Sequence, residues 1–213
     1  SELNKTMQAQ IKKKDTYKMG IDTLFNLRRQ LMQTLVSFKE DLCREDFNAI
    51  PFINADGYHS KTIAYSIWHI FRIEDIVAHT VITEDEQVFF TGNYQVRINS
   101  PIITTGNELV KQQIADFSKQ LNLEELYSYI FEVRESTEKI LERFSYDELK
   151  WKIPDERKGY LKSLNVVNCD EKAIWLIDYW CSKDIRGLIQ MPFSRHWIMH
   201  TEACLRIKNK IHS

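Results

Sequence analysis

Apolar residues recur at steps of three and four positions along four long stretches of the chain, and this spacing constrains the fold more than any other feature. In residues 16–44 the apolar positions are Met19, Leu24, Leu27, Leu31, Leu35, Phe38 and Leu42. Residues 61–84, 123–144 and 194–211 repeat the pattern, and the first of these is apolar on more than one side. Such spacing places apolar side chains on one face of an α-helix. Because only 6 glycines and 4 prolines occur in 213 residues, little turn material is left for a many-stranded sheet, and the sequence predicts an all-α protein.

The segments that connect these four helices are long, and weaker helical patterns occupy residues 108–120 and 170–185 within them. Long connections permit crossovers between helices instead of simple hairpins. We therefore predict one domain over residues 1–213, a four-helix bundle with long crossover connections and one or two auxiliary helices. Ser60 and Ser194 are the predicted N-caps of the second and fourth helices, and "RGLIQMPF" is expected to interrupt the pattern before the fourth.

The charge balance argues against partners that are bound through a basic surface. The formal net charge is −1, and the lysine run at residues 12–14 is typical of a solvated helix start. We therefore expect neither nucleic acid nor a membrane as a partner. The cysteines form no C-x-x-C pair, no leader is recognisable, and no apolar run approaches the roughly 18 residues of a membrane span. These features favour a cytoplasmic protein.

Two histidines, His196 and His200, stand four positions apart in "SRHWIMHTEA". Residues at this spacing share one face of a helix, so both imidazoles can reach a single metal ion. The apolar residues that share or border this face are Phe193, Trp197, Cys204, Ile207 and Ile211. Two unpaired imidazoles in an apolar core would cost about 1 to 3 kcal/mol each, and a metal would offset this cost. The alternative is a pair of core histidines without a metal.

A metal site needs a third ligand, and His69 is our choice. A catalytic zinc ion takes three protein ligands and keeps one position open. His69 lies in the middle of the second helix within "SIWHIFRIED", where a helix that faces the bundle axis would place it. His79 is about 15 Å farther along this helix and is expected at the surface or rim. We expect His59 and His212 to be solvated, and Cys204 to be a small buried hydrophobe that does not bind the metal.

No protein base accompanies the histidine pair. Trp197 occupies the position in which the H-E-x-x-H motif of zinc proteases carries its glutamate. The acidic residues nearest in sequence to the ligand helices are Glu74, Asp75, Asp178 and Glu202. We expect these to be surface charges or to orient an imidazole. Tyr65 is expected to pack in the core, with a place in the wall of the site as the alternative.

The stretches "IWHIFRIED" and "RHWIMHTEA", at these two places in a chain of this length, resemble the DinB/YfiT-like family. The resemblance implies a four-helix bundle with a tri-histidine metal site, and it assigns the ligands to His69, His196 and His200. Members of that family with assigned activities are S-transferases of low-molecular-weight thiols or thiol-dependent isomerases. Residues 89–121 and 152–185 depart from the compact family pattern as added segments.

The function that we predict is a metal-dependent transfer reaction that uses a low-molecular-weight thiol. The cofactor would be a divalent ion, with zinc preferred over nickel or another late divalent metal. Its open position would hold a water of lowered pKa or receive a substrate thiol, and the missing glutamate favours the thiol. The alternatives are a metal-dependent hydrolase and a non-catalytic bundle that binds a small molecule or a partner. The aromatic content of 12% and the segment after the second helix would suit a ligand pocket or a homodimer face equally.

Overall fold

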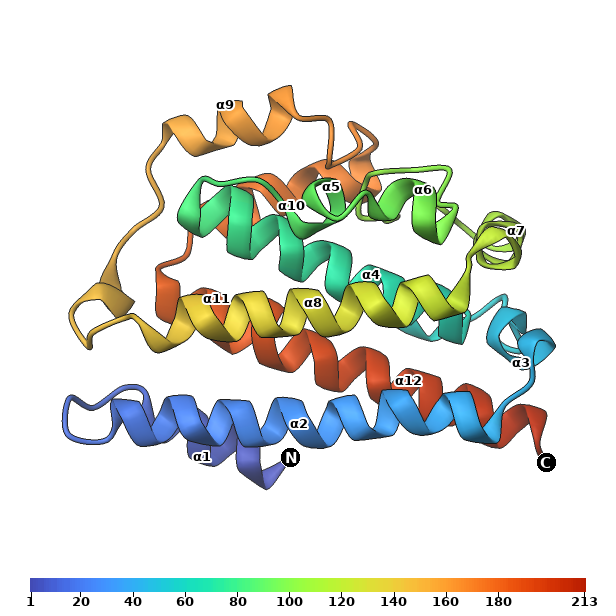
Figure 1. The fold of residues 1–213 in the computed structure, drawn as a ribbon, viewed down its shortest axis with the longest axis horizontal. Coiled ribbons are helices and arrows are strands. Elements are labelled where there is room, and N and C mark those ends of the chain that lie inside the picture. Colours follow the sequence, from blue (N-terminus) through green and yellow to red (C-terminus); the bar gives the residue numbers. More distant parts are fainter.

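The computed structural model describes residues 1–213 and is helical throughout, apart from loops and one isolated β-bridge between Lys152 and Asp184. The predicted all-α class is therefore confirmed. Four long helical segments form the body of the molecule (Figure 1). They are α2 (Tyr17–Asp41), α4 (Ile63–Asp75) with its π-helical continuation η2 (Ile76–Thr83), α8 (Leu123–Glu142), and α12 (His196–Ile211) with the π-helical turn η4 (Met191–Arg195) before it.

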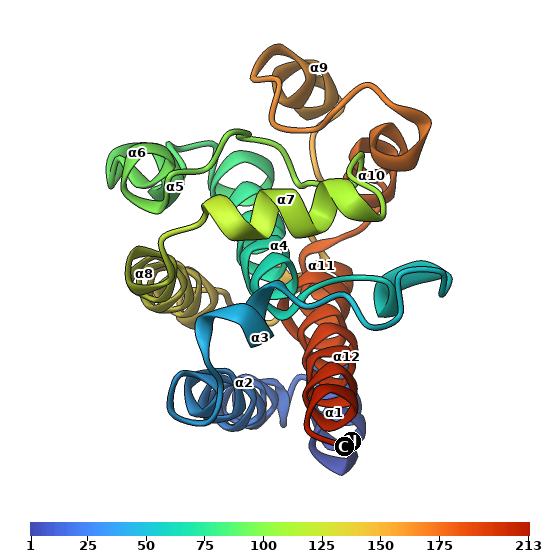
Figure 2. The same cartoon turned by 90° about the vertical axis from the view of Figure 1, so that its right-hand side faces the viewer.

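These four segments lie side by side. Helix α4 packs against α8 and α12, and α2 packs against the same two helices. The view along the helices in Figure 2 shows all four around a common centre. Their buried faces and those of the shorter helices form two hydrophobic clusters, one of which contains Trp68 and Trp197 and the other Trp180 and Phe193.

Helix α4 is the most deeply placed element, as its apolar pattern predicts. Every residue from Ile63 to Asp75 is buried. The helix begins at Thr62, whose hydroxyl accepts a hydrogen bond from the Tyr65 backbone N–H (3.0 Å). The predicted N-cap at Ser60 is wrong, because Ser60 ends the short 3-10 turn η1 (Gly57–His59) and only Thr62 has the extended backbone that a cap requires.

The predicted start of the last helix at Ser194 is also wrong. The stretch "RGLIQMPF" does not interrupt the helical pattern, because it forms most of α11 (Ile185–Gln190) and the first residues of η4. Ser194 lies inside this helical run and donates its hydroxyl to a carbonyl oxygen of α11 (2.7 Å). The break comes earlier, after α10 (Glu171–Cys181), where Asp184 caps α11 by accepting from the Gly187 backbone N–H (2.7 Å).

The other helices are short, and they lie at the ends of the body, on the side of α4 and, for one of them, along α2 on the opposite side (Figure 1). They are α1 (Glu2–Gln10), α3 (Arg44–Asn48), α5 (Val88–Thr91), α6 (Tyr94–Ile98), α7 (Gln112–Gln120), η3 (Glu148–Lys150) and α9 (Glu156–Ser163). No helix combines the length and the apolar character that a membrane crossing requires.

Three predicted boundaries need correction. Helix α7 begins at Gln112 and not at residue 108, because Lys111 has a positive φ of 49° that an α-helix does not admit. Helix α10 stops at Cys181, short of its predicted end. The lysines at residues 12–14 form the turn between α1 and α2 instead of a helix start.

Two fully buried ionic side chains on α4, Arg72 and Asp75, fasten the segment after η2 to the body of the molecule. The Asp75 carboxylate accepts hydrogen bonds from the backbone N–H groups of Val88 and Phe89 (2.9 and 2.8 Å). Arg72 donates to the carbonyl oxygen of Ile103 (2.6 Å). The prediction that Asp75 is a surface charge or orients an imidazole is therefore wrong, because this carboxylate is 0% exposed and caps a short helix.

Candidate metal centre

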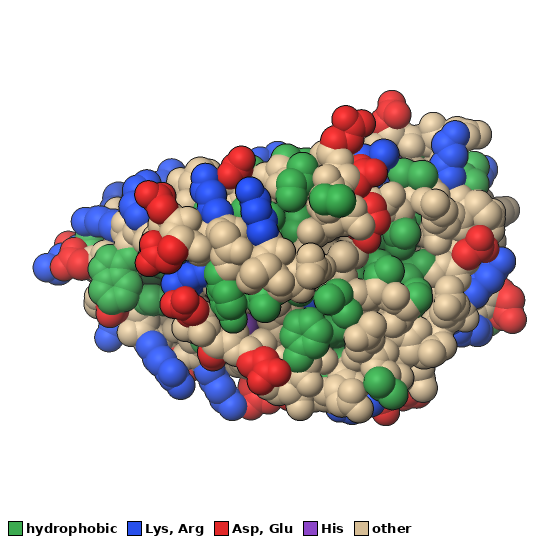
Figure 3. Space-filling model, turned by 90° about the horizontal axis from the view of Figure 1, so that it is seen from above, with side chains coloured by type: hydrophobic (Ala, Val, Ile, Leu, Met, Phe, Trp, Pro, Cys, Tyr) green, Lys and Arg blue, Asp and Glu red, His purple; other side chains and the backbone are tan.

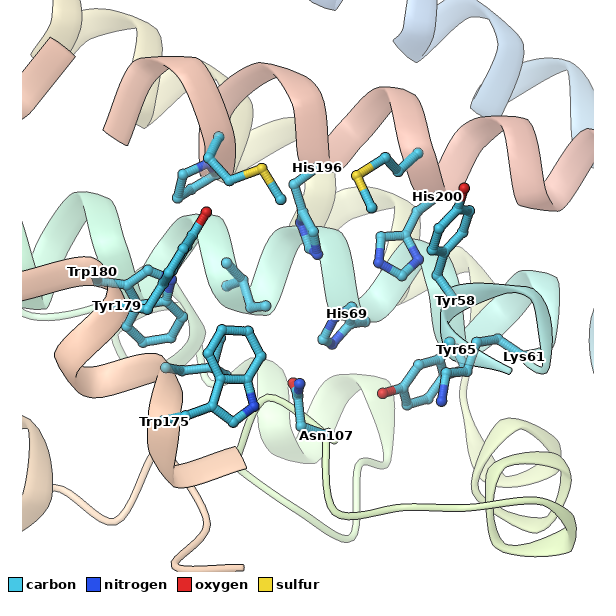
Figure 4. A pocket seen from close by; sticks show the side chains of 16 residues that line it. Tyr58, Lys61, Tyr65, His69, Asn107, Trp175, Tyr179, Trp180, His196 and His200 are labelled. Atoms are coloured by element: carbon cyan, nitrogen blue, oxygen red, sulfur yellow. The ribbon is translucent and has the colours of Figure 1, made fainter. Parts of the chain in front are cut away.

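The structure brings His69, His196 and His200 together. One potential ligand atom of each lies within 4.8 Å of the others. The ring centroid of His69 is 5.1 Å from that of His196 and 5.0 Å from that of His200. All three side chains are buried, and Figure 4 shows the imidazoles of α4 and α12 pointing toward one another across a cavity. The predicted convergence of two helices on one point is therefore present.

A backbone carbonyl orients the His69 imidazole. Its Nδ1 lies 2.6 Å from the carbonyl oxygen of Thr105. Because a carbonyl oxygen can only accept, Nδ1 carries the hydrogen and Nε2 keeps its lone pair for a ligand. Tyr65 stacks on the same ring, with centroids 5.3 Å apart, and donates its hydroxyl to the carbonyl oxygen of Gly106 (2.8 Å). Tyr65 is thus both buried in the core and part of the wall of the site.

Burial keeps the three imidazoles neutral. It lowers the pKa of His69 to about 4 and lowers the pKa values of His196 and His200 well below the usual value, with the neighbouring imidazoles adding to the effect in the last two. The Nδ1 atoms of His196 and His200 are buried without a hydrogen-bond partner. Three neutral imidazoles with unpaired nitrogens are a donor set that fits a late divalent metal ion.

Gly106, next to Thr105, provides a test of the hydrogen bond by which the Thr105 carbonyl orients His69. Its φ is +78°, and a Cβ atom there would lie 2.9 Å from ring carbons of both Trp68 and Tyr65. We expect Gly106→Ala to lower stability by about 1 to 3 kcal/mol and to weaken metal binding, because the Thr105 carbonyl would move away from His69.

The matched control is Gly57→Ala. Gly57 also has a positive φ, +67°, but a Cβ atom there would meet nothing within 4 Å. Gly57→Ala should therefore lower stability through backbone strain but leave metal affinity unchanged. Thermal unfolding and metal titration of both variants check the prediction, and equal metal affinities in the two variants would contradict it.

The histidines open into a cavity of about 400 Å³. Sixteen residues line it, and nine of them are hydrophobic. Figure 4 shows Lys61 and Tyr58 at one end and Trp180 at the other, with the histidines between them. Figure 3 shows hydrophobic side chains gathered between charged ones on the upper face of the molecule, with a small area of histidine visible among them.

Two of the connecting segments, residues 89–121 and 152–185, form part of the cavity wall. The first supplies Asn107, and the second supplies Trp175 and Tyr179. Sequence reasoning missed these residues. The aromatic-rich stretch "IWLIDYW" in α10 was the only signal that could have found two of them.

No carboxylate lines the cavity, and Lys61 is its only lysine or arginine. Asp178 and Glu202 are exposed, as expected of surface charges, and Asp178 pairs with a lysine of α9 (2.9 Å). Glu74 is 0% exposed, so the prediction of a surface charge is wrong for it, as it is for Asp75. None of the four acidic residues takes part in the wall or forms a hydrogen bond to a ligand imidazole.

Glu74 instead joins the long helical segments. Arg28 of α2 donates two hydrogen bonds to its carboxylate (2.9 and 2.6 Å) and a third to the carbonyl oxygen of Phe193 (3.0 Å). The indole N–H of Trp197 also donates to Glu74 (2.6 Å). Because Phe193 and Trp197 stand on either side of His196 in the chain, this network fixes the position of the helical segment that carries His196.

His79 is buried and not at the surface or rim, which corrects the prediction. Its Nδ1 lies 2.6 Å from the Asp85 carboxylate and its Nε2 lies 2.8 Å from the Ser136 hydroxyl. These two partners satisfy both ring nitrogens, and for that reason the imidazole can be buried without a metal. The position of His79 outside the histidine group is as predicted.

The remaining candidates do not join the group. His212 is exposed, as predicted, whereas His59 is half-buried beside Arg206 (3.0 Å). Cys204 is 0% exposed and stands outside the histidine group. Burial raises the pKa of its thiol to about 12, which fits the predicted small buried hydrophobe.

Comparison with protein-family models found none that matches the chain, and comparison with curated proteins found no match. Chemically, the site offers three neutral nitrogen donors beside an apolar cavity large enough for a small organic molecule.

Proposed function

We propose that the protein is a metal-dependent enzyme of the DinB/YfiT-like class, a four-helix bundle that holds a divalent ion at His69, His196 and His200. The convergence of three buried, neutral imidazoles beside a cavity carries this proposal. Zinc is the favoured ion, with nickel or another late divalent metal as the alternative, because imidazole nitrogen suits all of them. The long connections would supply the walls that define the substrate.

The reaction we favour is the transfer of a low-molecular-weight thiol to an electrophile. A divalent ion at the three histidines would act as a Lewis acid and lower the pKa of a thiol or a water molecule at its open position. The cavity wall contains no carboxylate that could serve as a base, which favours a thiol because a thiol needs less help to ionise. The chain itself orients His69 through the Thr105 carbonyl and surrounds the site with apolar side chains.

The test is thiol-dependent consumption of a panel of electrophiles by protein loaded with zinc or nickel. We expect activity in the wild type and in Cys204→Ser, because the buried Cys204 thiol is not the nucleophile. His196→Ala should lose both the metal and the activity. His79→Ala is the matched control, since it removes a buried imidazole outside the group and should keep the metal.

Three outcomes would contradict the proposal. Loss of activity in Cys204→Ser would make that cysteine the nucleophile. Metal-dependent consumption without any thiol would favour a hydrolase. Absence of metal binding in the wild type, with a small molecule retained in the cavity, would favour the non-catalytic binding protein.

A further inference from the structure

Lys61 stands at the cavity without an anionic partner. Its Nζ lies 5.5 Å from the centre of the Tyr65 ring, which stacks on His69. The side chain is half-buried, and no carboxylate lines the cavity around it. Removing an ammonium group from water is unfavourable unless a counter-charge replaces the lost hydration. The Lys61 ammonium is therefore available to pair with an anionic group of a ligand.

A second polar group in the wall also lacks a partner. The side-chain oxygen of Asn107 is buried and makes no hydrogen bond. Figure 4 shows this side chain pointing into the cavity between Trp175 and Tyr65. A buried amide oxygen without a partner is unfavourable and can only accept, so a hydrogen-bond donor on a bound ligand would stabilise it.

The opposite end of the cavity is aromatic. The rings of Trp175 and Tyr179 lie 5.5 Å apart at 72°, and Trp180 is buried beside them. Trp175 is 49% exposed, so part of its ring in the cavity wall is not covered by the protein. Figure 4 shows this aromatic end and the Lys61 end on opposite sides of the three histidines.

We infer that the site takes an organic anion with a flat apolar part, and that Lys61 selects the anionic group while Trp175 stacks on the flat part. The atom on which the chemistry occurs would then lie between these two ends, beside the histidines. This inference names the substrate class of the site described above and in that respect rests on the proposed function.

A cationic ligand is the alternative that an aromatic corner raises, because cations bind over aromatic faces. The charge around the cavity opposes it. The wall carries Lys61 and no carboxylate, and a divalent ion at the histidines would add positive charge. An anion is therefore the favoured ligand on electrostatic grounds.

The experiment compares naphthoate with its neutral amide, naphthamide, by calorimetric titration of chelator-treated protein, so that the anion cannot bind a metal. Wild-type protein should prefer naphthoate by about tenfold, the size of one charge-assisted hydrogen bond. Lys61→Met should abolish this preference and leave naphthamide affinity unchanged, which also shows that the variant is folded. Trp175→Ala should weaken both ligands by about three- to tenfold. Lys14→Met, at an exposed turn, is the control and should bind both probes as the wild type does.

An unchanged preference in Lys61→Met would overturn the inference, and so would binding of neither probe by the wild type. Titration of His196→Ala separates this inference from the proposed function. Preference for naphthoate in that variant, together with a wild type that takes up no metal, would support anion selection by Lys61 while the proposed function fails. If the wild type binds metal at the histidines but Lys61→Met still prefers naphthoate, the proposed metal site would stand and the role of Lys61 in anion selection would fail.

Discussion

The metal-loaded protein should unfold about 10 °C above the metal-free protein, and His200→Ala should abolish this difference. A ligand that binds only the folded state stabilises it by about 4 kcal/mol at a free concentration of about a thousand times its Kd. For a domain of this size each kcal/mol raises the Tm by about 2 to 4 °C. His200 would supply one of three donors in the proposed site, so its removal should reduce metal affinity by orders of magnitude. Calorimetric scans with and without zinc measure both quantities.

His79→Ala is the control for this experiment, since His79 is also a buried imidazole and lies on the helical segment that carries His69. It should lower the Tm of both forms, because it leaves Asp85 and Ser136 without their hydrogen bonds, but it should preserve the metal-dependent difference. An equal metal-dependent rise in His200→Ala would remove His200 from the ligand set. If neither zinc nor nickel raises the Tm of the wild type, the three histidines would be part of the wall of a ligand cavity and not a metal site.

The grouping of the three histidines could be predicted because it depends on local periodicity. The spacing of His196 and His200 places them on one face of any helix, and the apolar neighbours of both stretches turn that face toward the core. His69 follows from the same argument, since the sequence of α4 is apolar on more than one side and every residue of the helix is buried. The long helices were predictable for this reason too.

The acidic residues of α4 show where such reasoning stops. Glu74 and Asp75 resemble surface charges in the sequence, but partners far along the chain allow both to be fully buried. The counter-charge of Glu74 is Arg28, 46 residues away. Asp75 pairs with Arg72 on its own helix (3.4 Å), but it also accepts hydrogen bonds from the more distant backbone N–H groups of Val88 and Phe89. A local pattern cannot show that a charge has a distant counter-charge.

The cavity wall was beyond prediction for a related reason. Lys61, Asn107 and Trp175 come from three separate connections, and only the tertiary packing of these connections brings them together in one wall. The N-cap of α4 was predicted wrongly for a different reason. Ser60 and Thr62 both have suitable hydroxyls, and the choice between them depends on backbone angles set by the preceding turn η1.

Arg28→Leu should lower the free energy of unfolding by about 3 to 5 kcal/mol, because it would leave the Glu74 carboxylate buried without its counter-charge. The Phe193 carbonyl would lose its donor as well, which loosens η4 immediately before His196. We therefore expect weaker metal binding in this variant, although Arg28 does not line the cavity. Urea unfolding and zinc titration give the two measurements.

Two further variants separate the ion pair from the bulk of the side chain. Arg29→Leu changes the neighbouring, exposed arginine of α2 and should alter stability by less than about 0.5 kcal/mol. The double variant Arg28→Leu with Glu74→Leu should recover much of the lost stability, because two apolar side chains of similar extent need no partner, although the Trp197 indole N–H would remain unpaired. If the double variant loses as much free energy of unfolding as the two single variants together, the two side chains act independently. The network would then not fix the position of the helix that carries His196. Additivity would then point to packing of the Arg28 side chain against Trp197, 4.1 Å from its ring, as the main contribution.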